Sequence, residues 1–161
     1  MLKALLSSAQ GFLFVKNAVV GIATTQFGEI MRSYAREVAF CKIYSYLMGG
    51  DLDEDLSQFD SSKLTEEDMS FVDNLVQGVV ANKSQLEEIV AQYSHSFKLH
   101  RIYRPDLAAL ELALYEMIHT DTPHPVVINE AVSIVKKYST EKSVGYVNGI
   151  LAAFARSRQN G

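Results

Sequence analysis

The sequence predicts an all-α protein, a compact bundle of about six to seven helices. Apolar residues recur at helical spacing over most of the chain, no stretch keeps the alternation of a β-strand, and the connections are short. The 161 residues suffice for one domain with a sizeable core, and 48% apolar and 21% charged residues are ordinary for a globular protein.

Residues 1–30 are expected to form an N-terminal extension of uncertain role, ahead of a helical domain over 31–161. The extension carries only three charged residues, and Lys16 interrupts its apolar run before the run reaches the length of a secretory signal or a membrane span. The single cysteine, Cys41, cannot form an internal disulfide and suits a reducing cytoplasm. We therefore expect a cytoplasmic protein without a membrane role.

The first two helices of the domain are expected over 31–48 and 66–82. The first lacks Gly and Pro, and Gly49-Gly50 would end it. After an acidic connection, Thr65 and Asp68 offer a capping box for the second helix. Apolar residues follow helical spacing along it: Met69, Val72, Leu75, Val76 and Val79.

Another capping box is expected at Ser84 and Glu87, opening a third helix over 85–94. A linker rich in histidine and basic residues follows over 95–104. Pro105 then suits the first turn of a helix that runs to His119.

The stretch 120–155 is typical of a turn with two prolines, a helix, a four-residue break and a last helix. Gly145 and Gly149 lie four apart on that last helix. Each glycine costs about 1 kcal/mol relative to alanine there, so we expect tight packing or a ligand beside them. Three polar residues are expected to hold the two helices together: Asn129, Glu130 and Asn148.

The residues indicate neither an enzyme nor a metal or cofactor site. No cysteine or carboxylate completes a tetrahedral set around the four histidines. Cys41 falls within a helical stretch among apolar neighbours, so it is expected in the core. No local signature of an activated nucleophile is present.

The charge pattern leaves room for an anion-binding face despite the formal net charge of −4. Residues 51–73 hold nine acids against one base, so the rest of the chain is mildly basic. Arg32 and Arg36 are one helical turn apart near the expected start of the first helix, where the helix dipole favours a phosphate. Tyrosines nearby could stack on unpaired bases. The pattern alone slightly favours solvated arginines and half-buried tyrosines over such a face.

Four blocks in this order resemble the NusB family of transcription antitermination factors. They are "YAREVAFCKIYSYL", "LVQGVVANKSQLEEIV", "LALYEM" and "VVINEAVSIVKKYSTEKSVGYVNGIL", and together they span roughly residues 31–155. The resemblance implies an all-α fold. It implies binding to the boxA element of ribosomal RNA leaders, jointly with NusE, a small-subunit ribosomal protein, in a complex that keeps RNA polymerase from terminating.

The resemblance also implies site residues by position. For RNA these are Arg32, Arg36, Lys142 and Tyr146. For the protein partner they are Tyr44, Tyr115 and Glu116.

The sequence departs from the family pattern in three places. The usual run of arginines is reduced to Arg32 and Arg36, Glu111 stands where arginine is common, and Gly145 replaces a more polar residue. Fewer phosphate contacts would weaken RNA binding. A protein-binding helical module without RNA specificity therefore stays open, as does the RNA-binding domain of a methyltransferase with a separate catalytic partner. Monomer and homodimer are both open.

Overall fold

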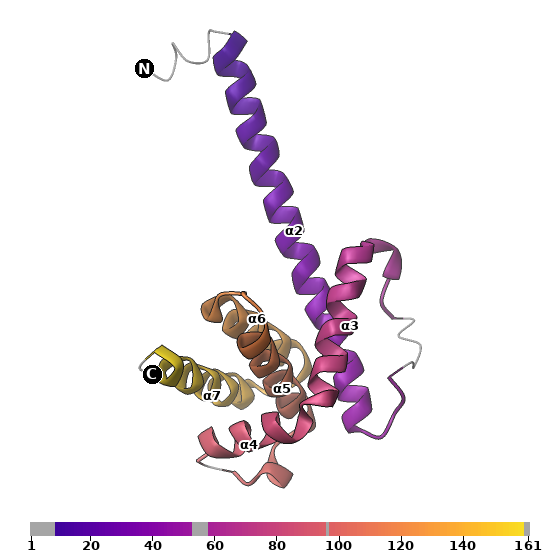
Figure 1. Ribbon diagram of the computed structural model, residues 1–161, viewed down its shortest axis with the longest axis vertical. Coiled ribbons are helices and arrows are strands. Elements are labelled where there is room, and N and C mark those ends of the chain that lie inside the picture. The colour runs from indigo at the N-terminus through magenta and orange to yellow at the C-terminus, as the bar shows by residue number, and fades with distance from the viewer. Residues whose placement is uncertain (1–8, 53–57, 96, 160–161) are drawn as a thin grey trace. The chain divides into compact units, whose positions relative to one another are not determined.

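The computed structural model describes the backbone of residues 9–52, 58–95 and 97–159, with side chains from residue 24 onward. These residues form helices and connections and no strand, which confirms the all-α prediction. The chain divides into two units, the first ending at Tyr34 and the second spanning Ala35–Gly161. The α-helices of the described residues (Figure 1) are α2 Ala9–Leu47, α3 Glu66–Ala81, α4 Lys83–Tyr93, α5 Arg104–His119, α6 His124–Tyr138 and α7 Glu141–Gln159.

Helix α2 begins at Ala9, so the expected helix start at Met31 is wrong. Arg32 and Arg36 consequently lie in the interior of a 39-residue helix rather than in its first turn. The dipole argument for a phosphate there no longer holds, because the effect fades beyond the terminal turn. The end of α2 is as expected: the chain leaves the helix after Leu47, and Gly49 takes a φ of +86°, which favours glycine.

The capping box of α3 is confirmed. Thr65 Oγ1 accepts from the Asp68 amide at 3.1 Å, and Asp68 Oδ2 accepts from the Thr65 amide at 3.1 Å. The predicted apolar face of α3 is buried except at Met69, which is 39% exposed.

The capping box predicted for α4 is wrong. Helix α4 begins at Lys83, so Ser84 lies inside it and is exposed, and the N-cap is Asn82. The Glu87 carboxylate pairs with Lys83 on the same helix instead of reaching back to a cap. The side-chain Nδ2 of Asn82 donates to the carbonyl of Gly78 at 2.8 Å, which joins the end of α3 to the start of α4.

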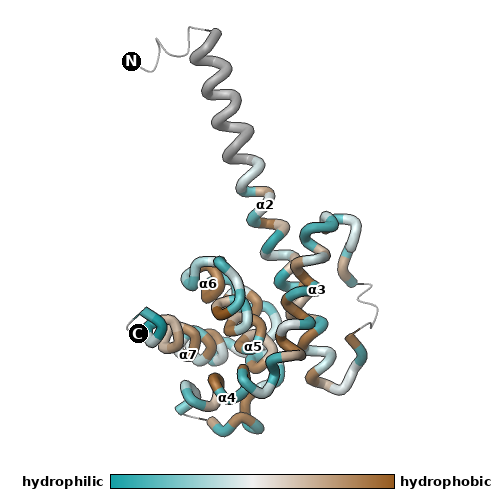
Figure 2. Tube along the Cα trace, in the orientation of Figure 1, coloured by the Kyte–Doolittle hydropathy of each residue, from teal (hydrophilic) through white to brown (hydrophobic). Residues whose placement is uncertain are grey.

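Helix α5 is the centre of the second unit. It contacts α3, α4, α6 and α7, and α6 packs in turn against α7. Every residue of α5 from Asp106 to Met117 is buried, and Figure 2 shows stretches of hydrophobic residues along this helix. Pro105 occupies its first turn, as predicted. Burial of this length on all sides accounts for the leucine- and alanine-rich sequence.

Helix α5 carries a buried acidic residue, Glu111, among apolar neighbours. The Glu111 side chain is 0% exposed, and neither carboxylate oxygen has a hydrogen-bond partner among the described residues. Burial raises the pKa of Glu111 to about 7; nearby Lys83 and Arg104 oppose that rise, and Glu87 adds to it.

The part of α2 after Tyr34 packs against α5 and α6. Phe40 is 1% exposed, and its ring centroid lies 5.1 Å from that of Tyr138. The Tyr138 hydroxyl donates to Glu37 at 2.5 Å, and Lys137 pairs with the same carboxylate. Cys41 is buried here, as expected of a core residue.

Helices α6 and α7 are separated by two residues, Ser139 and Thr140, rather than by the expected four. Ser139 Oγ donates to Asp106 Oδ1 at 2.5 Å, and Thr140 Oγ1 accepts from the Ser143 amide at 3.3 Å. The hydroxyl groups of this break therefore connect α7 to the first turn of α5.

The polar residues and glycines predicted to join α6 and α7 do not do so as expected. Asn129 and Asn148 are exposed. A Cβ placed on Gly145 or Gly149 would have nothing within 4 Å, so the predicted tight packing at these glycines is wrong. Only Glu130 reaches a buried group, with Oε2 at 3.9 Å from Arg36 Nη1.

Candidate functional site

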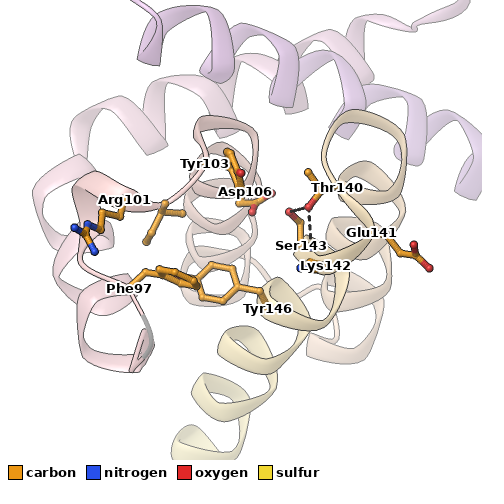
Figure 3. Close-up of a pocket in the computed structure, with 10 residues that line it drawn as sticks. Phe97, Arg101, Tyr103, Asp106, Thr140, Glu141, Lys142, Ser143 and Tyr146 are labelled. Carbon is orange, nitrogen blue, oxygen red and sulfur yellow. Dashed lines mark hydrogen bonds between the residues drawn. The ribbon is translucent and has the colours of Figure 1, made fainter.

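A cavity of about 560 Å³ opens between the segment before α5 and the start of α7 (Figure 3). Its size lies within the range of ligand-binding pockets. Three parts of the chain line it: the segment before α5 with Phe97, Arg101, Ile102 and Tyr103; the first turn of α5 with Asp106; and the start of α7 with Thr140, Glu141, Lys142, Ser143 and Tyr146.

Aromatic rings form one wall of the cavity. Phe97 and Tyr146 meet edge to face, with ring centroids 5.7 Å apart and planes at 78°, and Figure 3 shows them side by side. Phe97 is 52% exposed and Tyr103 is 65% exposed, which is unusual for rings of this size. Exposed aromatic faces are the groups on which unpaired bases stack.

The Tyr146 hydroxyl forms a hydrogen bond with Ser94. The hydroxyl oxygens of the two residues are 2.7 Å apart. Burial raises the pKa of the Tyr146 hydroxyl, and the charge of Asp106 adds to the rise.

Basic side chains flank the aromatic wall. Arg101 and Lys142 are exposed and line the cavity from opposite sides. A second hollow of about 330 Å³ shares Phe97 and Arg101 with the first and adds Lys98 and His100. Exposed cations next to stacking rings fit an anionic, base-bearing ligand.

The floor of the cavity is polar but satisfied internally. Asp106 is 2% exposed, and its carboxylate accepts from Ser139. The hydroxyls of Thr140 and Ser143 are 2.8 Å apart. These groups bond to one another, so the floor positions α7 and leaves ligand contact to the rim.

The structure brings together two of the four residues expected at an RNA site. Tyr146 and Lys142 both line the cavity. Arg36 does not: it is 6% exposed, with Nη2 at 2.7 Å and Nε at 2.9 Å from the two carboxylate oxygens of Glu116. Arg36 is therefore held inside the protein by an ion pair, and its role in RNA binding stays a prediction. Arg32 belongs to the first unit, and its role in RNA binding stays a prediction.

The residues expected to contact a protein partner lie largely inside the second unit. Glu116 is 1% exposed and forms the ion pair with Arg36. Tyr115 is 9% exposed, stacks on His119 at 4.5 Å and fills the space left by Gly78. Tyr44 is half-buried and stacked on Phe40. A partner role for these three stays a prediction.

Sequence reasoning missed the segment before α5 as part of the site. Phe97, Arg101 and Tyr103 fall in a stretch that the sequence suggests to be a plain linker. Its alternation of aromatic and basic residues was the available signal, since that pattern is typical of nucleic-acid-binding surfaces.

The described residues hold neither a metal-binding cluster nor a membrane-spanning helix. No group of three or more His, Cys, Asp or Glu side chains in this part of the chain is arranged to hold a metal ion. Over the same residues, no helix has the length and apolar character needed to cross a membrane.

Comparison with known proteins gives a consistent result. The family model described as "NusB family" matches residues 33–156. The transcription antitermination protein NusB of Acetivibrio thermocellus is 40% identical over 126 residues, covering 74% of this chain and 85% of the relative. That of Syntrophotalea carbinolica is 35% identical over 145 residues, covering 79% and 93%.

Solved structures of NusB proteins agree with the sequence matches. T. maritima NusB matches with a TM-score of 0.70 and 28% identity, over 78% of this chain and 90% of that one. A chain from a crystal structure of antitermination factors NusB and NusE in complex with dsRNA matches with a TM-score of 0.66 and 25% identity, over 79% and 97%. The fold, the family match and these relatives together establish that the chain belongs to the NusB family.

Proposed function

We propose that the chain is a transcription antitermination factor that binds boxA-type RNA of ribosomal RNA leaders together with NusE and keeps RNA polymerase from terminating. The relatives that it resembles are named antitermination proteins. One structural relative is described in complex with NusE and RNA. In this role the protein acts without catalysis, in the cytoplasm where transcription takes place.

The observation that carries the proposal is the cavity wall at Tyr146. A half-buried tyrosine, two exposed aromatic residues and flanking cations line one hollow of about 560 Å³. Stacking supplies affinity for unpaired bases, and Arg101 and Lys142 supply charge for the backbone. Because the net charge of the chain is −4, RNA binding depends on this local group of cations and aromatic rings.

The test is fluorescence anisotropy of a labelled boxA-type RNA against a scrambled RNA, with and without NusE, at two salt concentrations. We expect the full chain to prefer boxA and NusE to strengthen that preference. Tyr146→Ala should weaken binding about 5- to 150-fold, the range for loss of one stacked base. Equal weak binding of both RNAs in every setting would refute the proposal.

A matched pair of arginines distinguishes the effect of charge at the cavity from that of charge elsewhere on the surface. Arg101 lines the cavity, whereas Arg156 is exposed in the last turn of α7. Arg156 lies about 21 Å along the helix from Lys142, at 1.5 Å per residue. Arg101→Ala should weaken both RNAs alike and lower the salt slope by about 0.7. Arg156→Ala should leave binding close to wild type.

A second function is favoured by one observation. Arg36, one of the two arginines expected to contact RNA, is paired with Glu116 inside the protein. A protein-binding module that forms a complex with NusE but has no RNA preference would fit that loss. Stable NusE binding with equal affinity for boxA and scrambled RNA, even within the complex, would favour this alternative.

A further inference from the structure

The two hydrogen bonds that link Tyr146, Ser94 and Phe97 have a fixed donor-to-acceptor direction. Ser94, at the C-cap of α4, is 9% exposed. Its Oγ donates to the Phe97 carbonyl at 2.8 Å and lies 2.7 Å from Tyr146 Oη. A carbonyl only accepts, and serine has a single hydroxyl proton. Both bonds therefore form together only when Tyr146 donates to Ser94 and Ser94 donates to Phe97.

This direction determines what Tyr146 can offer a ligand. The Tyr146 hydroxyl donates its one proton to Ser94. The remaining lone pairs of Oη can therefore only accept a hydrogen bond from a ligand. The ring cannot easily turn away, because the edge-to-face contact with Phe97 holds it as well. Burial raises the pKa of the Tyr146 hydroxyl, which keeps that proton in place at neutral pH.

We propose that Ser94 is a positioning residue that makes the Tyr146 hydroxyl an acceptor-only group, so that the base held against it presents an exocyclic amino group. This rests on the proposed function, because it concerns RNA bound in the same cavity. Adenine and cytosine carry an amino donor where guanine and uracil carry an oxygen. An oxygen facing Tyr146 would bring two acceptors together and leave both unpaired.

The experiment uses the full chain and boxA-type RNAs in which each adenosine is replaced in turn by inosine and each cytidine by uridine. Each replacement exchanges an amino group for an oxygen. At one position we expect the wild type to bind the amino base about five-fold more tightly, the effect of one hydrogen bond. Tyr146→Phe removes the hydroxyl and should bring that ratio to about one.

Ser94→Ala is the decisive variant. It releases the Tyr146 proton, which can then turn toward an oxygen, so the ratio should fall toward one while the ring remains. Ser84→Ala, at an exposed serine on the same helix, is the control and should keep the wild-type ratio. If Ser94 served packing alone, its loss would weaken both RNAs equally and leave the ratio intact.

The outcomes separate the two proposals. A wild-type ratio near one at every position, or a ratio that Ser94→Ala leaves unchanged, overturns the role of Ser94 even where boxA is preferred to the scrambled RNA. Loss of the boxA preference with a persistent amino-to-oxygen ratio would overturn the proposed function alone. Absence of binding to any RNA overturns both.

Discussion

Glu111 should make the stability of the protein fall as pH rises through neutrality. Its carboxylate is fully buried without a hydrogen-bond partner in the described part of the chain, and burial raises its pKa from 4.5 to about 7. A raised carboxyl pKa means that the folded state holds the proton more tightly than the unfolded state. Stability is then greatest below the unfolded pKa, declines as pH rises through the folded value and levels off above it.

The magnitude follows from the size of the shift. A shift from 4.5 to about 7, at 1.36 kcal/mol per unit, corresponds to about 3 kcal/mol lost between acidic and mildly alkaline pH. In a chain of this size, that loss corresponds to a melting temperature about 6 to 12 °C lower.

The assay compares wild type with Glu111→Gln, whose amide cannot ionise, by urea and thermal unfolding followed by circular dichroism from pH 5 to 8. We expect similar stability at pH 5 and a variant more stable than wild type by up to about 3 kcal/mol at pH 8. Glu88→Gln, an exposed position on α4, is the control and should track wild type. A difference between wild type and Glu111→Gln that does not change with pH would refute the reasoning.

Two further predictions concern packing at glycines, and a third concerns a buried ion pair. Gly78→Ala should destabilise by about 1 to 3 kcal/mol, because its Cβ would lie 1.9 Å from Tyr115 Cζ. Gly145→Ala has open space around its Cβ and should stabilise by up to about 1 kcal/mol, so urea midpoints that move in the same direction would contradict this account. Glu116→Gln should destabilise by up to about 3 to 5 kcal/mol, since it removes the bidentate partner of the buried Arg36 guanidinium and leaves only the Glu130 carboxylate, 3.9 Å away. Replacing both partners by apolar residues should restore much of that loss, and equal midpoints for the single and double variants would argue against a buried pair.

The sequence was most informative where structure depends on near neighbours. The Thr65–Asp68 capping box, the proline in the first turn of α5 and the apolar face of α3 all involve residues within a few turns of one another. Such features follow from local geometry alone. The capping box predicted at Ser84 failed because the helix starts one residue before it, at Lys83.

The site was predicted only in part, because its other components depend on distant residues. Arg36 has the sequence features of a surface cation, and its partner Glu116 lies 80 residues away. Phe97 and Ser94 join the site only because the chain before α5 passes beside the start of α7. Tyr146 and Lys142 line one cavity because they lie four residues apart on α7, and family resemblance rather than spacing named them; their role in RNA binding stays a prediction.

The contacts of α2 with the end of the chain have a consequence for biosynthesis. Glu37 bonds to residues that follow it by 100 and 101 positions. At a synthesis rate of about 5 to 20 residues per second, the ribosome needs about 5 to 20 s to make these partners after it has made Glu37. During that interval the apolar side of α2 around Phe40 lacks its α6 cover. The nascent chain is then exposed to chaperones and to aggregation until α6 is complete.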